Sequence, residues 1–183
     1  MAGAYIGVGG VARKMKNQYL GVGSVARKVK NGFAGVGGVA RKFFSAVESP
    51  FYIYNAGTWH SALNAAGATD ATDKGTYLQQ NGSTTVKLNA AIDVTDYNNA
   101  YVKVATNGSG DCRQILRLYD TSGTKVYDSE VSGGTKTSSY WTAAFDISSV
   151  TGSVKIRLLA YSVINSSTNS YGNSYYSQIY LTE

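Results

Sequence analysis

Hydrophobic and polar residues recur in three near-identical copies of a 14-residue unit at the start of the chain. Residues 5–18 read YIGVGGVARKMKNQ, residues 19–32 read YLGVGSVARKVKNG, and residues 33–46 read FAGVGGVARKFFSA. A unit this short buries no core of its own, so it must be stabilised by its copies, by other chains or by a larger assembly. The pattern therefore predicts a repeated segment that docks onto a partner.

Two periodicities compete within the repeats. Apolar residues spaced alternately four and three apart, from Val8 through Ala12 and Met15 to Phe43, form a heptad pattern that is typical of a helix. The glycines of each copy oppose this interpretation, because each glycine costs an exposed helix roughly 0.8–1 kcal/mol relative to alanine. A disordered basic tail is a third alternative, and the recurring apolar residues disfavour it.

The same glycines fit a β-hairpin better than a helix. Gly9-Gly10 stands between Val8 and Val11, where a two-residue hairpin turn requires positive φ, and Gly23-Ser24 and Gly37-Gly38 repeat the position. We therefore expect three tandem hairpins. The cross-strand pairs that this turn predicts in the first copy are Val8–Val11, Gly7–Ala12, Ile6–Arg13 and Tyr5–Lys14.

The repeats also carry the residues that we expect to contact partners. A two-stranded ribbon is marginal in water and leaves open edges. Its side chains would be covered by copies of the same chain, for example in a trimeric fibre root, or by another protein of a larger particle. The anchoring residues predicted on this basis are Tyr5, Val8, Arg13, Lys14, Tyr19, Val22, Arg27, Lys28, Phe33, Val36, Arg41 and Lys42.

Positive charge is concentrated in the repeats. Residues 1–46 hold eight Lys or Arg and no acid, whereas residues 47–183 hold nine basic and eleven acidic side chains, which together give the net charge of +6. Eight cations would suffice for salt-sensitive contact with nucleic acid. Because the Arg-Lys pairs keep a fixed register with Tyr and Val, we consider an acidic protein surface the simpler partner.

The remainder of the chain has the pattern of an antiparallel β domain. The single proline, Pro50, marks a linker at residues 47–50. Beyond it, short alternating runs are separated by Gly, Asn, Ser and Asp turns, which predicts an all-β fold: tandem β-hairpins followed by an antiparallel β-sandwich or jelly roll over residues 51–183. The predicted strands are 51–54, 76–79, 84–88, 100–106, 113–119, 125–130, 141–146, 153–163 and 174–181.

Catalytic and metal sites are difficult to assemble from this sequence. His60 is the only histidine and Cys112 the only cysteine, so neither a His-rich metal centre nor an internal disulfide is available. No nucleophile motif surrounds His60, and we expect no enzymatic activity. Asp70 and Asp73 lie among threonines in a predicted loop and are candidate ligands for a structural Ca²⁺, with a solvated loop as the alternative.

Aromatic residues are the better clue to binding. The chain holds fifteen tyrosines and two tryptophans, and sugar rings stack on aromatic side chains. The candidate glycan-binding residues are Trp59, Trp141, Tyr171 and Tyr175, each near a predicted strand end or loop. The alternative is that most of these rings pack within the sandwich or contact other subunits.

Several stretches resemble known families. TWHSAL, VKLNAAIDVTDYNNAYVKVA, ILRLYDTSGTKVY and the final YYSQIYLTE resemble carbohydrate-binding modules with galactose-binding-like jelly rolls. The YIGVGGVARK repeat resembles tandem segments at the start of virion structural proteins in phages and prophages of Gram-positive bacteria. Some modules of the jelly-roll kind carry a structural calcium ion.

The resemblance implies a non-enzymatic virion protein, either a tail or baseplate appendage, such as a tail fibre, or a capsid decoration or head fibre. Its partners would be other virion proteins, copies of itself and a host cell-surface glycan. A glycan-binding module without any assembly role is the alternative. Since no signal peptide and no membrane-spanning run are visible, we expect assembly in the host cytoplasm and location in the virion.

Overall fold

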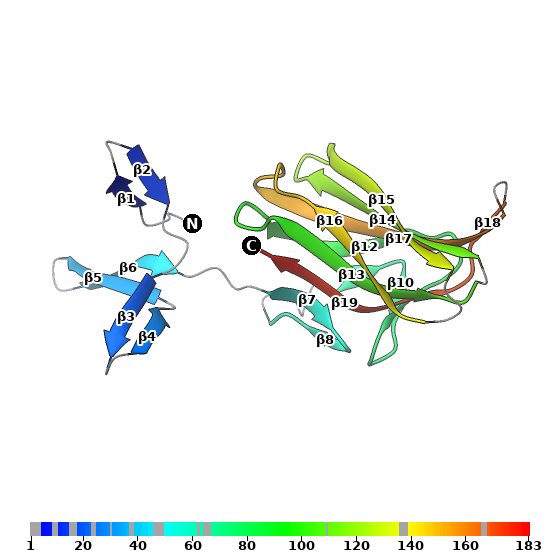
Figure 1. Cartoon of the computed structure of the whole chain (residues 1–183), viewed down its shortest axis with the longest axis horizontal. Coiled ribbons are helices and arrows are strands. Elements are labelled where there is room, and N and C mark those ends of the chain that lie inside the picture. The colour runs from blue at the N-terminus through cyan, green and yellow to red at the C-terminus, as the bar shows by residue number, and fades with distance from the viewer. Residues whose placement is uncertain are drawn as a thin grey trace. The chain divides into compact units, whose positions relative to one another are not determined.

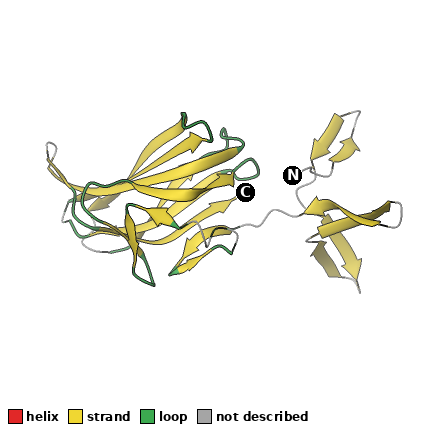
Figure 2. Ribbon diagram, turned by 180° about the vertical axis from the view of Figure 1, so that it is seen from behind, coloured by secondary structure: helices red, strands yellow, loops and turns green. Residues whose placement is uncertain are grey.

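The computed structural model describes most of the chain. The described residues are 5–8, 11–14, 18–22, 25–29, 31–36, 39–45, 50–61, 63, 67–108, 110–135, 139–165 and 168–183, of which those before 46 and 164–170 are described by their backbone. The chain divides into two compact units, Met1–Glu48 and Ser49–Glu183. Every element in the described residues is a strand (Figure 2). These residues contain no helix of the length and apolarity that crossing a membrane demands.

The first unit consists of three separate hairpins, one from each repeat. β1 (Tyr5–Val8) pairs with β2 (Val11–Lys14), β3 (Gln18–Val22) with β4 (Val25–Val29), and β5 (Asn31–Val36) with β6 (Val39–Ser45), all antiparallel. The predicted register of the first copy is confirmed, from Val8↔Val11 out to Tyr5↔Lys14. The glycine turns themselves lie outside the described residues.

The three hairpins share one register. The pairs Tyr19↔Lys28 and Phe33↔Lys42 occupy the place of Tyr5↔Lys14, and the valines next to each turn are paired in every copy. Each hairpin is a two-stranded sheet that pairs with no other strand in the described residues. The heptad helix is therefore the wrong interpretation of the repeats. In each copy the residues before the glycine turn pair as an antiparallel strand with the residues after it.

The second unit is an antiparallel β-sandwich of two sheets (Figure 1). The first, the β13 sheet, has the order β10 (Ala71–Asp73), β11 (Leu78–Gln80), β19 (Ser174–Thr182), β13 (Asn99–Thr106), β16 (Trp141–Asp146). β7 (Phe51–Asn55) also pairs with β19, and β8 (Thr58–Trp59) pairs with β7. The second, the β17 sheet, has the order β15 (Lys125–Thr135), β14 (Asp111–Asp120), β17 (Ser153–Asn165), β12 (Val86–Asp93), β9 (Ala68–Thr69), with β18 (Thr168–Ser170) beside β17.

All nine predicted strands of the sandwich are present, β16 with the predicted bounds and the others with one or both ends shifted. The largest differences are at β12, which runs to Asp93, and at β15, which runs to Thr135. Four short strands, β8, β9, β10 and β18, were not predicted, since two or three residues cannot display a period of two.

Alternation along the strands builds the core. In β17 the inward row is Val154, Ile156, Leu158 and Ala160: each side chain is at most 1% exposed, while Lys155 between them is exposed. In β13 the alternating residues Ala100, Val102 and Val104 are buried, and so are Ala105 and Thr106 at the end of the strand. Burial of such aliphatic side chains stabilises each by about 1.5–3 kcal/mol relative to leaving it in water.

One buried polar side chain joins the two sheets. Gln80 of β11 is fully buried, and its amide donates to the Ala160 carbonyl (3.0 Å) and to the Gly82 carbonyl (2.9 Å). Its carbonyl oxygen accepts from the Ala160 backbone N–H (3.1 Å) and from the Tyr176 hydroxyl (2.5 Å). The amide of Gln80 thus bonds the Ala160 peptide groups in the way that a neighbouring strand would.

Candidate binding face

A row of tyrosines crosses the outer surface of the β13 sheet. Tyr52 of β7 is opposite Tyr180 of β19, and Tyr180 is opposite Tyr101 of β13. The ring centroids of Tyr52 and Tyr180 lie 5.2 Å apart, and those of Tyr180 and Tyr101 lie 4.9 Å apart with nearly parallel planes. Cross-strand aromatic pairs of this kind stabilise a sheet while keeping part of each ring accessible.

Strand alternation explains why these rings point outward. The neighbours of Tyr180, Ile179 and Leu181, are buried in the core, and so are the neighbours of Tyr101. The three tyrosines are therefore half-buried on the opposite surface. Burial and the two adjacent tyrosines raise the pKa of Tyr180, so its hydroxyl stays protonated and keeps both a donor and acceptors for hydrogen bonds.

Polar groups and a second pair of rings continue this surface. Gln178, on the same side of β19, donates to the Asn55 side chain (2.9 Å). Tyr175, further along β19, makes an edge-to-face contact with Tyr77 at 5.3 Å between centroids. We refer to this surface as the tyrosine face, made up of Tyr52, Asn55, Tyr77, Tyr101, Lys103, Tyr175, Gln178 and Tyr180.

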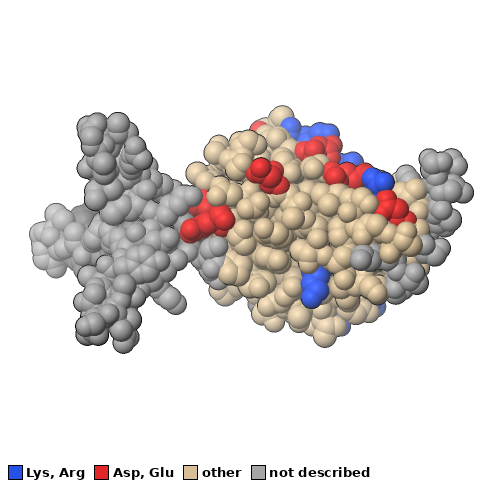
Figure 3. All heavy atoms as spheres, in the orientation of Figure 1, with Lys and Arg blue, Asp and Glu red and all other residues tan. Residues whose placement is uncertain are grey.

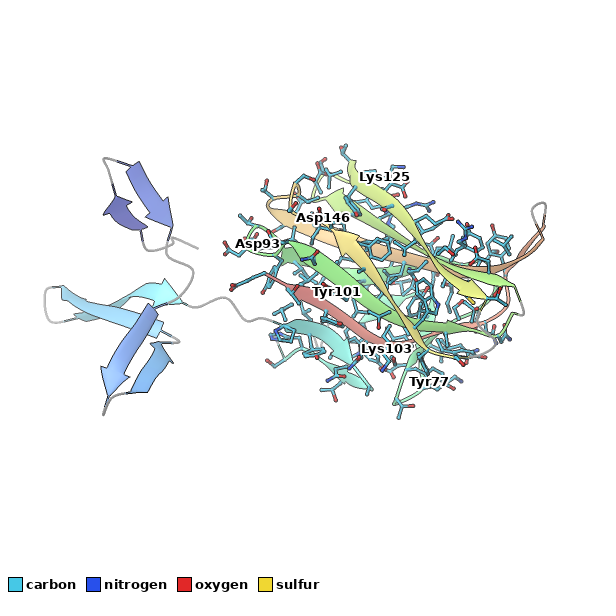
Figure 4. The ribbon with its side chains drawn as sticks, in the orientation of Figure 1. Tyr77, Asp93, Tyr101, Lys103, Lys125 and Asp146 are labelled. Carbon is cyan, nitrogen blue, oxygen red and sulfur yellow. The ribbon has the colours of Figure 1, made fainter. Side chains whose placement is uncertain are left out.

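The tyrosine face carries little charge. Figure 3 shows the surface of the β13 sheet as a broad, mostly uncharged area, with most acidic and basic side chains gathered toward the β14–β15 side. Figure 4 places Tyr101 and Lys103 in sequence along β13, with Tyr77 beyond them and Asp146 nearer the other edge. Apolar rings, phenol hydroxyls, amides and one cation suit an uncharged, hydroxyl-rich ligand that stacks.

Two of the sequence-predicted glycan residues lie away from this row. Trp59 is half-buried on β8, where its Nε1–H donates to Asp73 (3.3 Å) and its ring meets Tyr54 edge-on at 5.0 Å. Trp141 lies against β15, because a Cβ added at Gly133 would come 2.4 Å from its ring. Its Nε1 is buried, without a hydrogen-bond partner in the part of the sandwich that the structure describes.

The other two predicted residues also lie apart from each other. Tyr175 belongs to the tyrosine face, as described above. Tyr171 is 42% exposed in the segment before β19, and its ring tilts against Tyr161 at 5.7 Å between centroids. The structure therefore includes one of the four in the tyrosine face, and the role of all four stays a prediction.

The candidate calcium residues have other partners. Asp70, with φ of 62°, forms an ion pair with Lys87 (2.8 Å). Asp73 accepts hydrogen bonds from the Gly75 backbone (2.9 Å) and from Trp59. Within the described residues, no three His, Cys, Asp or Glu side chains are grouped to hold a metal ion, and calcium binding stays a prediction.

His60 and Cys112 are placed in packed surroundings. The His60 ring lies 4.3 Å from the Phe51 ring between centroids. Cys112 is buried, and its Sγ shares a hydrogen bond of 3.0 Å with Thr106, whose hydroxyl also contacts Ser162 (2.8 Å).

The residues that sequence reasoning missed are Tyr52, Tyr101 and Tyr180. A signal was present, because each tyrosine directly neighbours an aliphatic residue of an alternating run, in FYIY, AYVKV and QIYL. Where the aliphatic residues turn inward, the tyrosine must turn outward.

Geometry thus defines an antiparallel β-sandwich with an aromatic outer face. Comparison with solved structures finds a family 6 carbohydrate-binding module (TM-score 0.41, 16% identity, 63% of this chain and 80% of that one). It also finds such a module from Clostridium stercorarium in complex with cellobiose, with a TM-score of 0.40, 16% identity, and coverage of 63% of this chain and 83% of that one. A structure of infectious bursal disease virus, Gt strain, has a TM-score of 0.38, 14% identity, and coverage of 93% of this chain and 41% of that one. No protein-family model and no curated protein matches the sequence. TM-scores this low establish neither a family nor a ligand for the chain.

Proposed function

We propose that this chain is a non-enzymatic phage virion protein, displayed as a tail or capsid appendage, that binds a host-surface glycan through the tyrosine face. The observation that carries the binding proposal is the row Tyr52–Tyr180–Tyr101 on an almost uncharged surface. The virion setting and the lack of catalysis rest on the repeats and on the sequence resemblance described above.

The dimensions of the row favour a chain of sugars over a single one. Adjacent strands lie about 4.8 Å apart, so rings on β7, β19 and β13 extend over roughly 10 Å. Sugar C–H faces stack on such rings, while hydroxyls find partners in Gln178, Asn55 and the phenol groups.

The hairpins support an attachment role for residues 1–46. Each copy closes only a two-stranded sheet, and an isolated hairpin is marginally stable in water. Strands from other virion proteins or from copies of the same chain, for example in a trimer, would complete them by edge pairing and side-chain burial.

Glycan binding is tested with the full chain on an array of host cell-wall polysaccharides, followed by titration of the best ligand. Tyr101→Ala and Tyr180→Ala each remove one ring of the row, and we expect a roughly five- to thirtyfold loss of affinity, since stacked rings contribute about 1–2 kcal/mol. Tyr171→Ala removes an exposed ring outside the row and should leave the affinity unchanged.

The reverse pattern would contradict the proposal. If Tyr171→Ala weakens binding while the two row variants do not, the ligand sits at the loop near Tyr161. If the intact protein binds no host polymer, the sandwich is not an adhesion module.

Attachment is tested by deleting residues 1–46. The sandwich is a compact unit of its own, so we expect the shortened protein to fold and to be excluded from particles. Incorporation of the shortened protein at full occupancy would show that attachment depends on another surface.

A further inference from the structure

The β17 sheet contains a hollow where two of its strands fall out of register. Lys87 is paired with Arg157 and Ala91 with Lys155, so residues 88–90 of β12 all lie opposite Ile156. Extra residues of this kind bulge a strand and redirect its side chains. The hollow has a volume of about 190 Å³, room for about six waters at about 30 Å³ each. Its lining is Lys87, Leu88, Asn89, Lys155, Ile156 and Arg157.

Three cations surround this hollow on the outer side of the sheet. Ile156 points into the core, so Lys155 and Arg157 on either side of it point outward, and Lys87 is exposed on β12. Arg157 is directly opposite Lys87 on one side and Arg117 on the other. Like charges placed opposite each other destabilise a sheet, and an anion bound between them would remove that repulsion.

Carboxylates compensate only part of this charge. Asp70 forms an ion pair with Lys87 (2.8 Å), and Asp128 forms one with Arg117 (3.2 Å). Arg157 and Lys155 have no carboxylate partner among the residues that the structure describes. About two positive charges at the hollow are therefore unneutralised.

Arg157 is also held in place before any ligand arrives. Its guanidinium carbon lies 3.9 Å from the centre of the Tyr119 ring, a cation–π contact that restricts the side chain. Tyr119 belongs to β14, so this contact holds the guanidinium beside β17, whose residues Lys155, Ile156 and Arg157 line the hollow. The planar N–H fork of a guanidinium matches two oxygens of an oxyanion.

We propose that the hollow is a binding site for a phosphate group, as inorganic phosphate or as a phosphate monoester. A monoester carries a charge of about −1.5 to −2 at pH 7 and three acceptor oxygens. This charge matches the two cations without a carboxylate partner, Lys155 and Arg157, together with Lys87, which is also paired with Asp70. A carboxylate supplies one charge and two oxygens, and leaves one cation unneutralised. The site lies on the other sheet from the tyrosine face and does not depend on glycan binding.

The test is an NMR titration of the ¹⁵N-labelled full chain with inorganic phosphate at low ionic strength, in which the chemical shift of each backbone amide is followed. Resolving individual amides separates the hollow from the basic repeats, which attract anions non-specifically. We expect saturable shifts at residues 88–90 and at Ile156. Sodium chloride at equal ionic strength should not reproduce them.

Three variants make the test specific. Arg157→Gln and Lys155→Gln should each weaken the saturable binding at least tenfold, whereas Lys74→Gln, an exposed cation on a loop of the other sheet, should leave it unchanged. Without phosphate, Arg157→Gln removes the opposed cations and also the cation–π contact with Tyr119, so it should unfold at a temperature close to that of the parent. A purely structural arginine would instead lower that temperature.

The remaining outcomes decide the question as well. Shifts confined to residues 1–46, equal shifts with chloride, or equal losses in all three variants would overturn the proposal. A parallel titration with glycerol 3-phosphate identifies the source: binding at least as tight as that of inorganic phosphate indicates an esterified phosphate on a larger molecule, and weaker binding indicates the free ion.

Discussion

Replacing Gln80 by alanine tests the contribution of one buried group of hydrogen bonds between the two sheets. In the native structure the amide of Gln80 makes four hydrogen bonds, to the Ala160 N–H and C=O, the Gly82 C=O and the Tyr176 hydroxyl. Gln80→Ala removes all four in a fully buried place. The Ala160 carbonyl keeps one partner, the Ser174 hydroxyl (3.1 Å).

The expected loss of stability follows from the groups left without partners. The Ala160 N–H and the Tyr176 O–H each lose their acceptor, and a buried unsatisfied donor costs about 1–3 kcal/mol. Together with the space left by the amide, Gln80→Ala should lower the free energy of unfolding by about 3–6 kcal/mol. That is a large share of the roughly 5–15 kcal/mol that stabilises a domain.

Urea unfolding of the full chain, followed by tryptophan fluorescence, measures this change. The matched control is Gln79→Ala, one residue earlier, whose side chain donates a hydrogen bond to Asn81 (2.8 Å) at the surface. This variant should change the free energy of unfolding by about 0.5 kcal/mol or less. Tyr176→Phe alone should cost about 1 kcal/mol. The double variant should lose less stability than the sum of the two single variants, since Tyr176→Phe removes the hydroxyl that Gln80→Ala leaves without an acceptor. A loss for Gln80→Ala no larger than for Gln79→Ala would refute the bridging role.

Two further predictions concern the glycines at positive φ and the stability of the fold at alkaline pH. Gly57→Ala should lower the free energy of unfolding by at least about 2 kcal/mol, because at φ of +94° its new Cβ would lie 1.5 Å from the Gly75 carbonyl oxygen. Gly123→Ala, at φ of +91° with open space around it, should cost only about 1 kcal/mol in the same thermal or urea unfolding experiment. Burial, and then the hydrogen bond to Glu130 (2.7 Å), raise the pKa of Tyr161 from 10.0 to about 12. The folded state thus keeps a proton that the unfolded chain releases near pH 10. The stabilising contribution of Tyr161 is therefore fully present below pH 10 and is lost as the pH rises to about 12. Tyr161→Phe should reduce this loss of stability at alkaline pH, and an unchanged pH profile would contradict the assignment.

Strands and hairpins were predictable because their signals are local. Alternation over six or more residues predicted strands such as β13 and β17, and the spacing of Gly9-Gly10 between valines predicted the hairpin register down to Tyr5↔Lys14. Burial of one side of each strand leaves few other registers available. The short strands β8 to β10 offered no comparable pattern.

The candidate sites were harder to predict because they depend on sheet order. Tyr52, Tyr101 and Tyr180 come from three distant parts of the chain and become neighbours only because β19 lies between β7 and β13. The same is true of Lys87 and Arg157, which the pairing of β12 with β17 brings together. A polar residue such as Gln80 also reads as a surface position until its distant partner, Ala160, is known.

The repetition of one hairpin per 14 residues has an evolutionary consequence. Because every copy closes its pairs internally, unequal recombination between the near-identical coding stretches would add or delete a whole hairpin without disturbing any other strand partner. If the hairpins attach the chain to a partner, as proposed above, the number of attachment points, and with it the avidity, can vary while the sandwich stays the same.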